Sequence, residues 1–398
     1  MWSARGSRGK GIVGDSRLRT EPFGETSSAV RWPLCLFLIL TGFVFVWVAL
    51  PISPGWIEEY YSLGLYRVVA AVLVPVGDAV TFSITGVVLA FASVTSLFLW
   101  GLRWCSLRRA GASHWRGLRW GLVRGVFAAL LLYTLFVVMW GGGYRRRPLA
   151  DRIGLESTPP STAEVNKCAE ALARLVTASV PVSIDRDPTA ALRAVAEAMP
   201  TLVADLEGSD VAVPVVVKRL PAGTLLRWGS AGVTSPYFLE AHVDGGLPDA
   251  AFVSVGAHEL AHVAGRCGEA EATFVGVAAA LRAEHVFARY AAALFFFVEV
   301  MAQLPEAERE ALRARLPAVA LEDITAARAT ATRYRSAWLS RVQSIFYDCF
   351  LRSQGVDDGV ADYDRAVSLF VRAWQGGVID LHYPDGDARS ASPVADDF

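Results

Sequence analysis

The stretch His258-Glu259-Leu260-Ala261-His262 sets two histidines four residues apart, with a glutamate directly after the first. On an α-helix, residues i and i+4 project from one face, so both imidazoles can reach one ion at the ~2.0–2.1 Å of a zinc–nitrogen bond. Glu259 lies about 100° around the helix, where it can reach a water on the ion without being a ligand. This spacing is typical of zincins. The competing interpretation is a surface helix with two solvated histidines.

A third ligand is expected shortly after this motif, because a catalytic zinc site takes three protein ligands and keeps one position open. Gly265 comes three residues after His262, where a chain that leaves a helix often needs a left-handed residue. The next acidic residues are Glu269 and Glu271. We expect Glu269 to be the ligand, with Glu271 as the second choice. Whichever is not a ligand is then an exposed acid or a partner for a histidine N–H.

These residues predict peptide-bond hydrolysis, with Zn²⁺ as cofactor and Glu259 as the general base on a zinc-bound water. A group that stabilises the oxyanion is also needed. The candidates are His242, Tyr237 and Tyr334, although each is more simply explained as an ordinary packed or surface residue.

The composition indicates that part of the chain lies in lipid, because 53% of its 398 residues are hydrophobic and only 19% are charged. Residues 34–50, 79–100 and 120–140 are apolar and about long enough to cross a bilayer, which takes ~20 residues. Trp100, Trp120 and Trp140 lie at the ends of these segments, as interfacial anchors do. Residues 66–76 are also apolar but are interrupted near Pro75, so we expect an interfacial or re-entrant helix there.

The distribution of arginine predicts the orientation in the membrane. Arginines gather in the N-terminal tail, residues 1–33, and in the loop between the second and third spans, and both should therefore be cytoplasmic. With three spans, everything after Trp140 lies outside the cytoplasm. The run Arg145-Arg146-Arg147 argues the other way, and an even number of spans would invert the result.

The remaining chain predicts a linker at 141–163, one mainly helical domain with a small β element at 164–383, and a disordered tail at 384–398. Ser161 and Glu164 form a capping box, and Asp187-Pro188 begins a further helix. Residues 211–217 are rich in valine and predict an edge strand, since they include Pro214. Further helical patterns begin after Glu269 and at Pro305, and two more cover residues 321–351 and 360–374.

Several stretches outside the motif support a family resemblance, which covers about residues 34–375. The chain resembles the domain-of-unknown-function 3810 family of bacterial membrane proteins, which are similar to zinc metallopeptidases of the gluzincin type. This resemblance implies a three-span anchor with a helical zincin-like domain, and it favours Glu269 as the ligand. Family members tend to have Glu-Asp-Glu-Ala-Asn where this chain has Glu269-Ala270-Glu271-Ala272-Thr273. The other matching stretches include residues 58–66, Trp140-Gly141, Glu240-Ala241 and Tyr347-Asp348-Cys349-Phe350-Leu351.

The sequence therefore predicts a membrane-anchored zinc metalloprotease of the bacterial cytoplasmic membrane, with its catalytic domain outside the cytoplasm. Its partners would be the lipid bilayer and a protein or peptide substrate near the membrane. A net charge of −1 disfavours nucleic acid. The alternative is a non-catalytic zinc-binding membrane protein with a sensing or assembly role. An intramembrane protease is disfavoured because Arg266, Glu269 and Glu271 flank the motif, and a transporter because the spans carry few ionisable groups.

Overall fold

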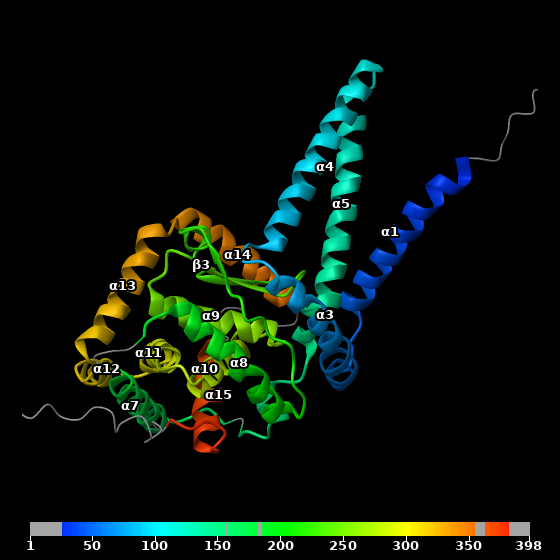
Figure 1. Cartoon of the computed structure of the whole chain (residues 1–398). Helices are drawn as coiled ribbons and strands as arrows, with labels where there is room; N and C mark the ends of the chain where they lie inside the picture. Colours follow the sequence, from blue (N-terminus) through cyan, green and yellow to red (C-terminus); the bar gives the residue numbers. More distant parts are fainter. Residues whose placement is uncertain (1–25, 157, 181–184, 355–362, 382–398) are drawn as a thin grey trace, which may run out of the picture.

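The computed structural model describes residues 26–156, 158–180, 185–354 and 363–381. Long helices project from a mainly helical body that contains one small sheet (Figure 1). The prediction of a mainly α protein with a small β element is confirmed. The predicted tail at 384–398 and most of the N-terminal tail lie outside the described residues.

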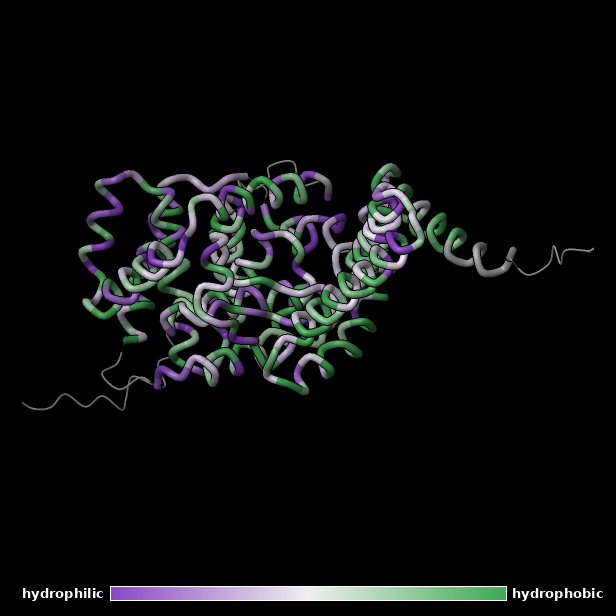
Figure 2. The backbone as a smooth tube through the Cα atoms, turned by 90° about the horizontal axis from the view of Figure 1, so that it is seen from above, coloured by the Kyte–Doolittle hydropathy of each residue, from purple (hydrophilic) through white to green (hydrophobic). Residues whose placement is uncertain are grey.

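The projecting helices are α1 (Thr26–Ala49), α4 (Ile84–Arg109) and α5 (His114–Met139) (Figure 1). Helices α4 and α5 run antiparallel as a pair, in which Trp100 and Trp104 of α4 pack over Gly121 and Gly117 of α5. Seen from above, the projecting helices stand at one end of the body (Figure 2). Most of the body therefore extends to one side from the base of these helices.

Three helices near the N-terminus are long and apolar enough to cross a membrane, as predicted, and two of them overlap the second and third predicted spans. They are Pro54–Asp78, Ile84–Arg109 and His114–Met139, whereas the predicted first span corresponds to the shorter apolar helix Leu34–Ala49 within α1. Both α4 and α5 also extend beyond the predicted spans into their arginine-rich ends. Hydropathy identifies only the apolar segment of each helix, whereas the helix itself continues through backbone hydrogen bonds into the polar residues beyond that segment.

The segment Pro54–Asp78 is one continuous helical stretch that packs against the body. It comprises α2 (Pro54–Trp56), the π-helical η1 (Ile57–Leu65) and α3 (Tyr66–Asp78). The predicted interruption near Pro75 is wrong, because Pro75 lies inside α3. One side of α3 buries Tyr66 and Val74, and the other side leaves Val68 and Val72 exposed.

The body is built around helices α9, α10 and α11. Helix α10 packs between α9, α8 and α15, and α11 packs on α7 and α9. Alanine and glycine line much of this contact, so the helices approach closely and hold their side chains in fixed positions. The body helices are α7 (Thr162–Ala178), α8 (Pro188–Glu207), α9 (Asp249–Val263), α10 (Glu269–Arg282), α11 (Val286–Ala302), α12 (Glu306–Arg313), α13 (Ala318–Tyr334), α14 (Ala337–Ser353) and α15 (Tyr363–Gln375).

The predicted helix starts are confirmed, since Ser161 and Glu164 form the capping box of α7 and Asp187 caps α8. The helical pattern at 321–351 forms two helices, α13 and α14, because the chain turns at Arg335. The predicted linker contains two short helices, η2 (Gly141–Arg145) and α6 (Leu149–Arg152), that pack onto the body.

The sheet has the strand order β1-β3-β2, with β1 (Lys218–Leu220), β2 (Gly232–Ser235) and β3 (Glu240–Asp244). Strand β1 runs parallel to β3, and β2 runs antiparallel to it along an edge. The predicted strand at 211–217 is wrong. The carboxylate of Asp78, at the end of α3, accepts hydrogen bonds from the N–H groups of Val215 and Val216, so these donors do not join the sheet.

The sheet also holds the start of α4. The buried carboxylate of Glu240 in β3 accepts hydrogen bonds from the backbone N–H groups of Ile84 (2.8 Å) and Thr85 (2.9 Å). These are free donors at the helix N-terminus, where a negative charge is stabilising. Lys218 of β1 donates to the carbonyl of Gly77, 2.6 Å away. The projecting pair is thereby fixed to the sheet that borders the candidate site.

Candidate metal centre

Helices α9 and α10 bring the motif and the following acids together. Helix α9 ends at Val263, and Gly265 adopts a φ of +86°, the left-handed conformation expected for a turn at this position. The chain then reverses and begins α10 at Glu269. A Cβ on Gly276 of α10 would lie 3.0 Å from the Cα of His258, so the two helices touch backbone to backbone at the level of the motif.

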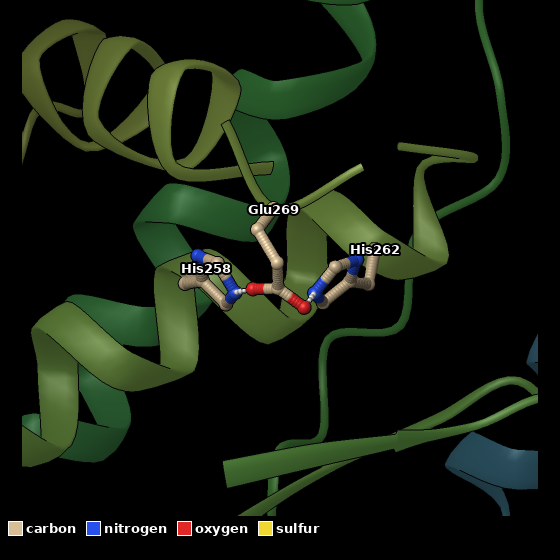
Figure 3. A group of neighbouring side chains, drawn as sticks. All are labelled: His258, His262 and Glu269. Carbon is tan, nitrogen blue, oxygen red and sulfur yellow. Dashed lines mark hydrogen bonds and ion pairs between the residues drawn. The ribbon is translucent and has the colours of Figure 1, made fainter. Parts of the chain in front are cut away.

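The side chains of His258, His262 and Glu269 converge on one point. The Glu269 carboxylate lies between the two imidazoles (Figure 3), with Oε2 at 3.1 Å from His258 Nε2 and Oε1 at 3.6 Å from His262 Nε2. The three candidate ligand atoms all lie within 4.8 Å of one another. Ligands at ~2.0–2.1 Å from a tetrahedral zinc ion are about 3.3 Å apart, so only small side-chain movements are needed.

The second nitrogen of each imidazole has its own partner. His262 Nδ1 lies 2.5 Å from the carbonyl oxygen of Arg266 and can only donate to it, so Nε2, which faces Glu269, is the candidate ligand atom. His258 Nδ1 lies 3.2 Å from the hydroxyl of Thr273. Metal-binding histidines are normally held in this way, because the outer hydrogen bond fixes the tautomer and the ring orientation.

The electrostatics of the cluster favour a cation. Burial disfavours a charged His262, but the carboxylate of Glu269 outweighs it and raises the pKa of His262 to about 9. Burial likewise disfavours a charged Glu269, yet the two histidines keep the pKa of Glu269 well below its usual value. The site therefore holds positive charge next to a carboxylate, and a divalent cation can take the place of a proton there.

Glu271, the second choice for the ligand, is directed away from the histidines. Its carboxylate accepts hydrogen bonds from the backbone N–H of Leu149 (2.6 Å) and from the guanidinium of Arg152 (2.9 Å). It therefore joins α10 to α6. Among the described residues, only His258, His262 and Glu269 form a group of metal-binding side chains.

Glu259 is buried beside this cluster and faces the edge strand β2. Its Oε2 accepts a hydrogen bond from the hydroxyl of Thr234, 2.8 Å away. Gly232 leaves room for the carboxylate, because a Cβ there would lie 2.5 Å from Glu259 Oε1. Burial raises the pKa of Glu259, and the nearby His262 and His258 oppose this rise. A carboxylate of raised pKa is suited to accept and return a proton near neutral pH.

The three residues considered for oxyanion stabilisation do not line the cavity in front of the cluster. His242 is buried in β3, with Nε2 at 2.8 Å from the Ser83 hydroxyl, and the Tyr237 hydroxyl lies 3.4 Å from the carbonyl of Leu132. Tyr334 packs over Gly223. Tyr347 of α14, which was not singled out, lines the cavity and donates a hydrogen bond to Glu269. The sequence feature that could have identified Tyr347 is its place in Tyr347-Asp348-Cys349-Phe350-Leu351, one of the stretches that support the family resemblance.

A cavity of about 1180 Å³ opens in front of the three candidate ligands. Helix α14 forms one wall, and β2 with the preceding turn η3 (Leu226–Trp228) forms another. Glu299 of α11 adds a further acid that the motif did not predict, and burial raises its pKa. A cavity of this size admits an extended peptide segment.

The α9–α10 turn is held by residues of α5 and α3. Trp140, at the end of α5, is buried and donates its indole N–H to the carbonyl of His262 at 2.8 Å, so the prediction that it is an interfacial anchor is wrong. Tyr66 of α3 donates to the carbonyl of Val263. The side chain of Arg266 is buried against Glu207. The end of α5 and the start of α3 therefore support the turn that carries His262.

A family model described as a protein of unknown function, DUF3810, matches residues 61–371. The chain belongs to the DUF3810 family. Comparisons with curated proteins and with solved structures found no match. The matched residues include α3, α4, α5 and all of α9 to α14. The candidate metal centre, and the residues of α3 and α5 that hold the α9–α10 turn, therefore lie within the part of the chain that the family model covers.

Proposed function

We propose that this member of the DUF3810 family is a membrane-anchored zinc-dependent metalloprotease. The observation that carries the proposal is the convergence of His258, His262 and Glu269 in front of a large cavity, with Glu259 one residue along the same helix. Three protein ligands with a fourth position facing a cavity are the hallmark of a catalytic zinc site, whereas structural sites are closed by four ligands. The proposed zincin-like, gluzincin-type domain rests on the same residues.

Each residue has a defined task in this proposal. His258, His262 and Glu269 would hold the zinc ion. Bound zinc lowers the pKa of a water molecule to ~7 and polarises a carbonyl group. Glu259 accepts the proton of the attacking water and passes it to the leaving amine, and Thr234 orients its carboxylate.

The edge strand β2 favours a peptide as substrate. One side of β2 pairs with β3, and residues 230–234 line the cavity. An extended peptide can add to a free strand edge through main-chain hydrogen bonds, which gives affinity without requiring a particular sequence. The hydroxyl of Tyr347 lies at the ligand Glu269 and is the nearest candidate to support the oxyanion.

The apolar helices support a location in the bacterial cytoplasmic membrane. The arginine-rich loop between α4 and α5 lies at the end of the pair that is remote from the body (Figure 1). By the positive-inside rule, this loop is cytoplasmic and the body lies on the outer side. The substrate is then a membrane or envelope protein.

The test is zinc content and cleavage of an unstructured protein by the full chain in nanodiscs. Wild type should bind about one zinc ion per chain, and His262→Ala and Glu269→Gln should lose it because they remove ligands. Glu271→Gln and the exposed control Glu197→Gln should keep it. Glu259→Gln should keep zinc and lose cleavage.

Two outcomes would overturn the proposal. A folded wild-type protein that binds no zinc excludes a metalloprotease. Zinc binding without cleavage by wild type favours the alternative of a non-catalytic zinc-binding protein with a sensing or assembly role.

A further inference from the structure

Helix α14 has an exposed apolar face that the body does not cover. Trp338, Ile345 and Phe346 are 71%, 59% and 72% exposed. Of the helix residues whose side chains are described, only Ser340 and Leu351 are buried. The main partner of the helix in the body is the short turn η3. Most helical stability in proteins comes from packing an apolar face, so an apolar face that stays exposed indicates a further surface.

The position of α14 indicates what that surface is. It lies on the side of the body from which α4 and α5 project (Figure 1). Near its end, the Phe350 ring lies 5.5 Å from Phe136 of α5, and Gln354 Nε2 lies 3.2 Å from the Tyr133 hydroxyl. Both partners lie in the last two turns of α5, so α14 meets the long helix at its base.

The apolar part of the projecting pair begins at that same base. From Ile84 to Leu102, just before Arg103, helix α4 is uncharged and about 28 Å long at ~1.5 Å per residue. This length matches the ~30 Å hydrocarbon core of a bilayer. Val87 and Val88, in the first turns of α4, are already exposed. Lipid around α4 would therefore begin where α4 leaves the body, at the level of α14.

We propose that α14 lies in the interface of the bilayer that α4 and α5 cross, with Trp338, Ile345 and Phe346 inserted among the lipids. The apolar face is then continuous with the lipid-facing surface of the long helices. Helix α14 carries two exposed arginines that suit lipid headgroups, Arg341 and also Arg352, which pairs with Asp348 at 2.9 Å. Apolar residues with arginines beside them are the pattern of helices that lie in the plane of a membrane surface.

This arrangement also defines the substrate class, a consequence that rests on the proposed function. Tyr347 and Ser344 on α14 line the cavity of the candidate centre. With one face in lipid and another on the cavity, α14 places the cavity beside the membrane surface. The substrates are then protein segments close to the outer surface of the bilayer, rather than soluble peptides in general.

The test measures the depth of α14 with a nitroxide label on the full chain in nanodiscs that contain anionic lipid. The label is attached by Phe346→Cys, after the exposed thiols are removed by Cys35→Ser, Cys105→Ser and Cys349→Ser. The matched control is Ala307→Cys, on the exposed surface of α12, which lies far from α4 and α5 (Figure 1). Collision rates with oxygen, which enters lipid, and with a water-soluble nickel chelate are compared.

At position 346 we expect several-fold more collisions with oxygen than with the chelate, and the reverse at 307. Frequent collisions with the chelate at 346 would place α14 in water and overturn the proposal. Protection from both reagents would mean that a protein partner or a second copy covers this face, and would overturn it as well. Because depth is measured without zinc or cleavage, failure of the metalloprotease proposal would be seen separately.

Discussion

The buried carboxylate of Glu207 is predicted to hold together the supports of the candidate centre. It lies at the end of α8, 3% exposed, with Arg146 at 2.9 Å and Arg67 at 3.4 Å, and it also pairs with Arg152 and Arg266. Burial alone would raise the pKa of Glu207, but the guanidinium groups of Arg266, Arg146 and Arg152 outweigh it and the pKa is lowered. The substitution Glu207→Gln keeps the shape of the side chain and removes this charge.

We expect a large loss of stability, because removing one partner of a buried ion pair leaves uncompensated charge and costs about 3–5 kcal/mol. For a body of this size, each kcal/mol lowers Tm by ~2–4 °C, so the expected decrease is roughly 6–20 °C. The assay is thermal unfolding of the full chain in nanodiscs. The control is Glu170→Gln, whose partners Arg174 and Arg315 are exposed, and for which less than about 1 kcal/mol is expected.

The same substitution should weaken zinc binding, since Arg266 supplies the carbonyl that orients His262. Loss of such outer support typically costs about 10–100-fold in metal affinity. A Tm for Glu207→Gln that equals the control would refute the reasoning about the arginine cluster. A large decrease in Tm with unchanged zinc affinity would refute the link from the cluster to the centre.

Three further predictions concern the same region. Gly276→Ala places a Cβ 2.8 Å from the carbonyl oxygen of Ala257, so it should lower the free energy of unfolding by about 1–3 kcal/mol, measured by thermal unfolding. It should also lower zinc affinity, measured in a competition titration. Because the pKa of Glu207 is below its unfolded value of about 4.3, its contribution is present above that pH and is lost as the pH falls through the folded pKa. The Tm of wild type should therefore fall more steeply below pH ~4 than that of Glu207→Gln, and parallel curves would contradict this. A zinc chelator should lower the Tm of wild type and leave the Tm of Glu269→Gln unchanged. If free zinc had been ~1,000 times Kd, removing it lowers the free energy of unfolding of wild type by about 4 kcal/mol.

Sequence patterns predicted correctly those features that depend on interactions between residues close together in the chain. The capping box at Ser161, the start of α8 at Asp187 and the left-handed turn at Gly265 each depend on residues within one or two helical turns, and all three are confirmed. The strand at 211–217 failed because its backbone donors bind Asp78, which lies far away in the sequence. The role of Trp140 was misjudged for the same reason, since its partner is the carbonyl of His262.

The sequence by itself determined the mainly helical class, the presence of apolar helices near the N-terminus and the pair of histidines on one helix face, because period and composition are properties of short segments. The position of Glu269 after the turn ranked it ahead of Glu271 as a candidate, but only the tertiary structure showed which of the two acids meets those histidines. Glu269 and Glu271 are two residues apart and equally acidic, but on α10 they point in different directions, Glu269 to His258 and Glu271 to Arg152. The close backbone contact of α9 and α10 at Gly276 determines this choice, which spacing along the chain could rank but not decide.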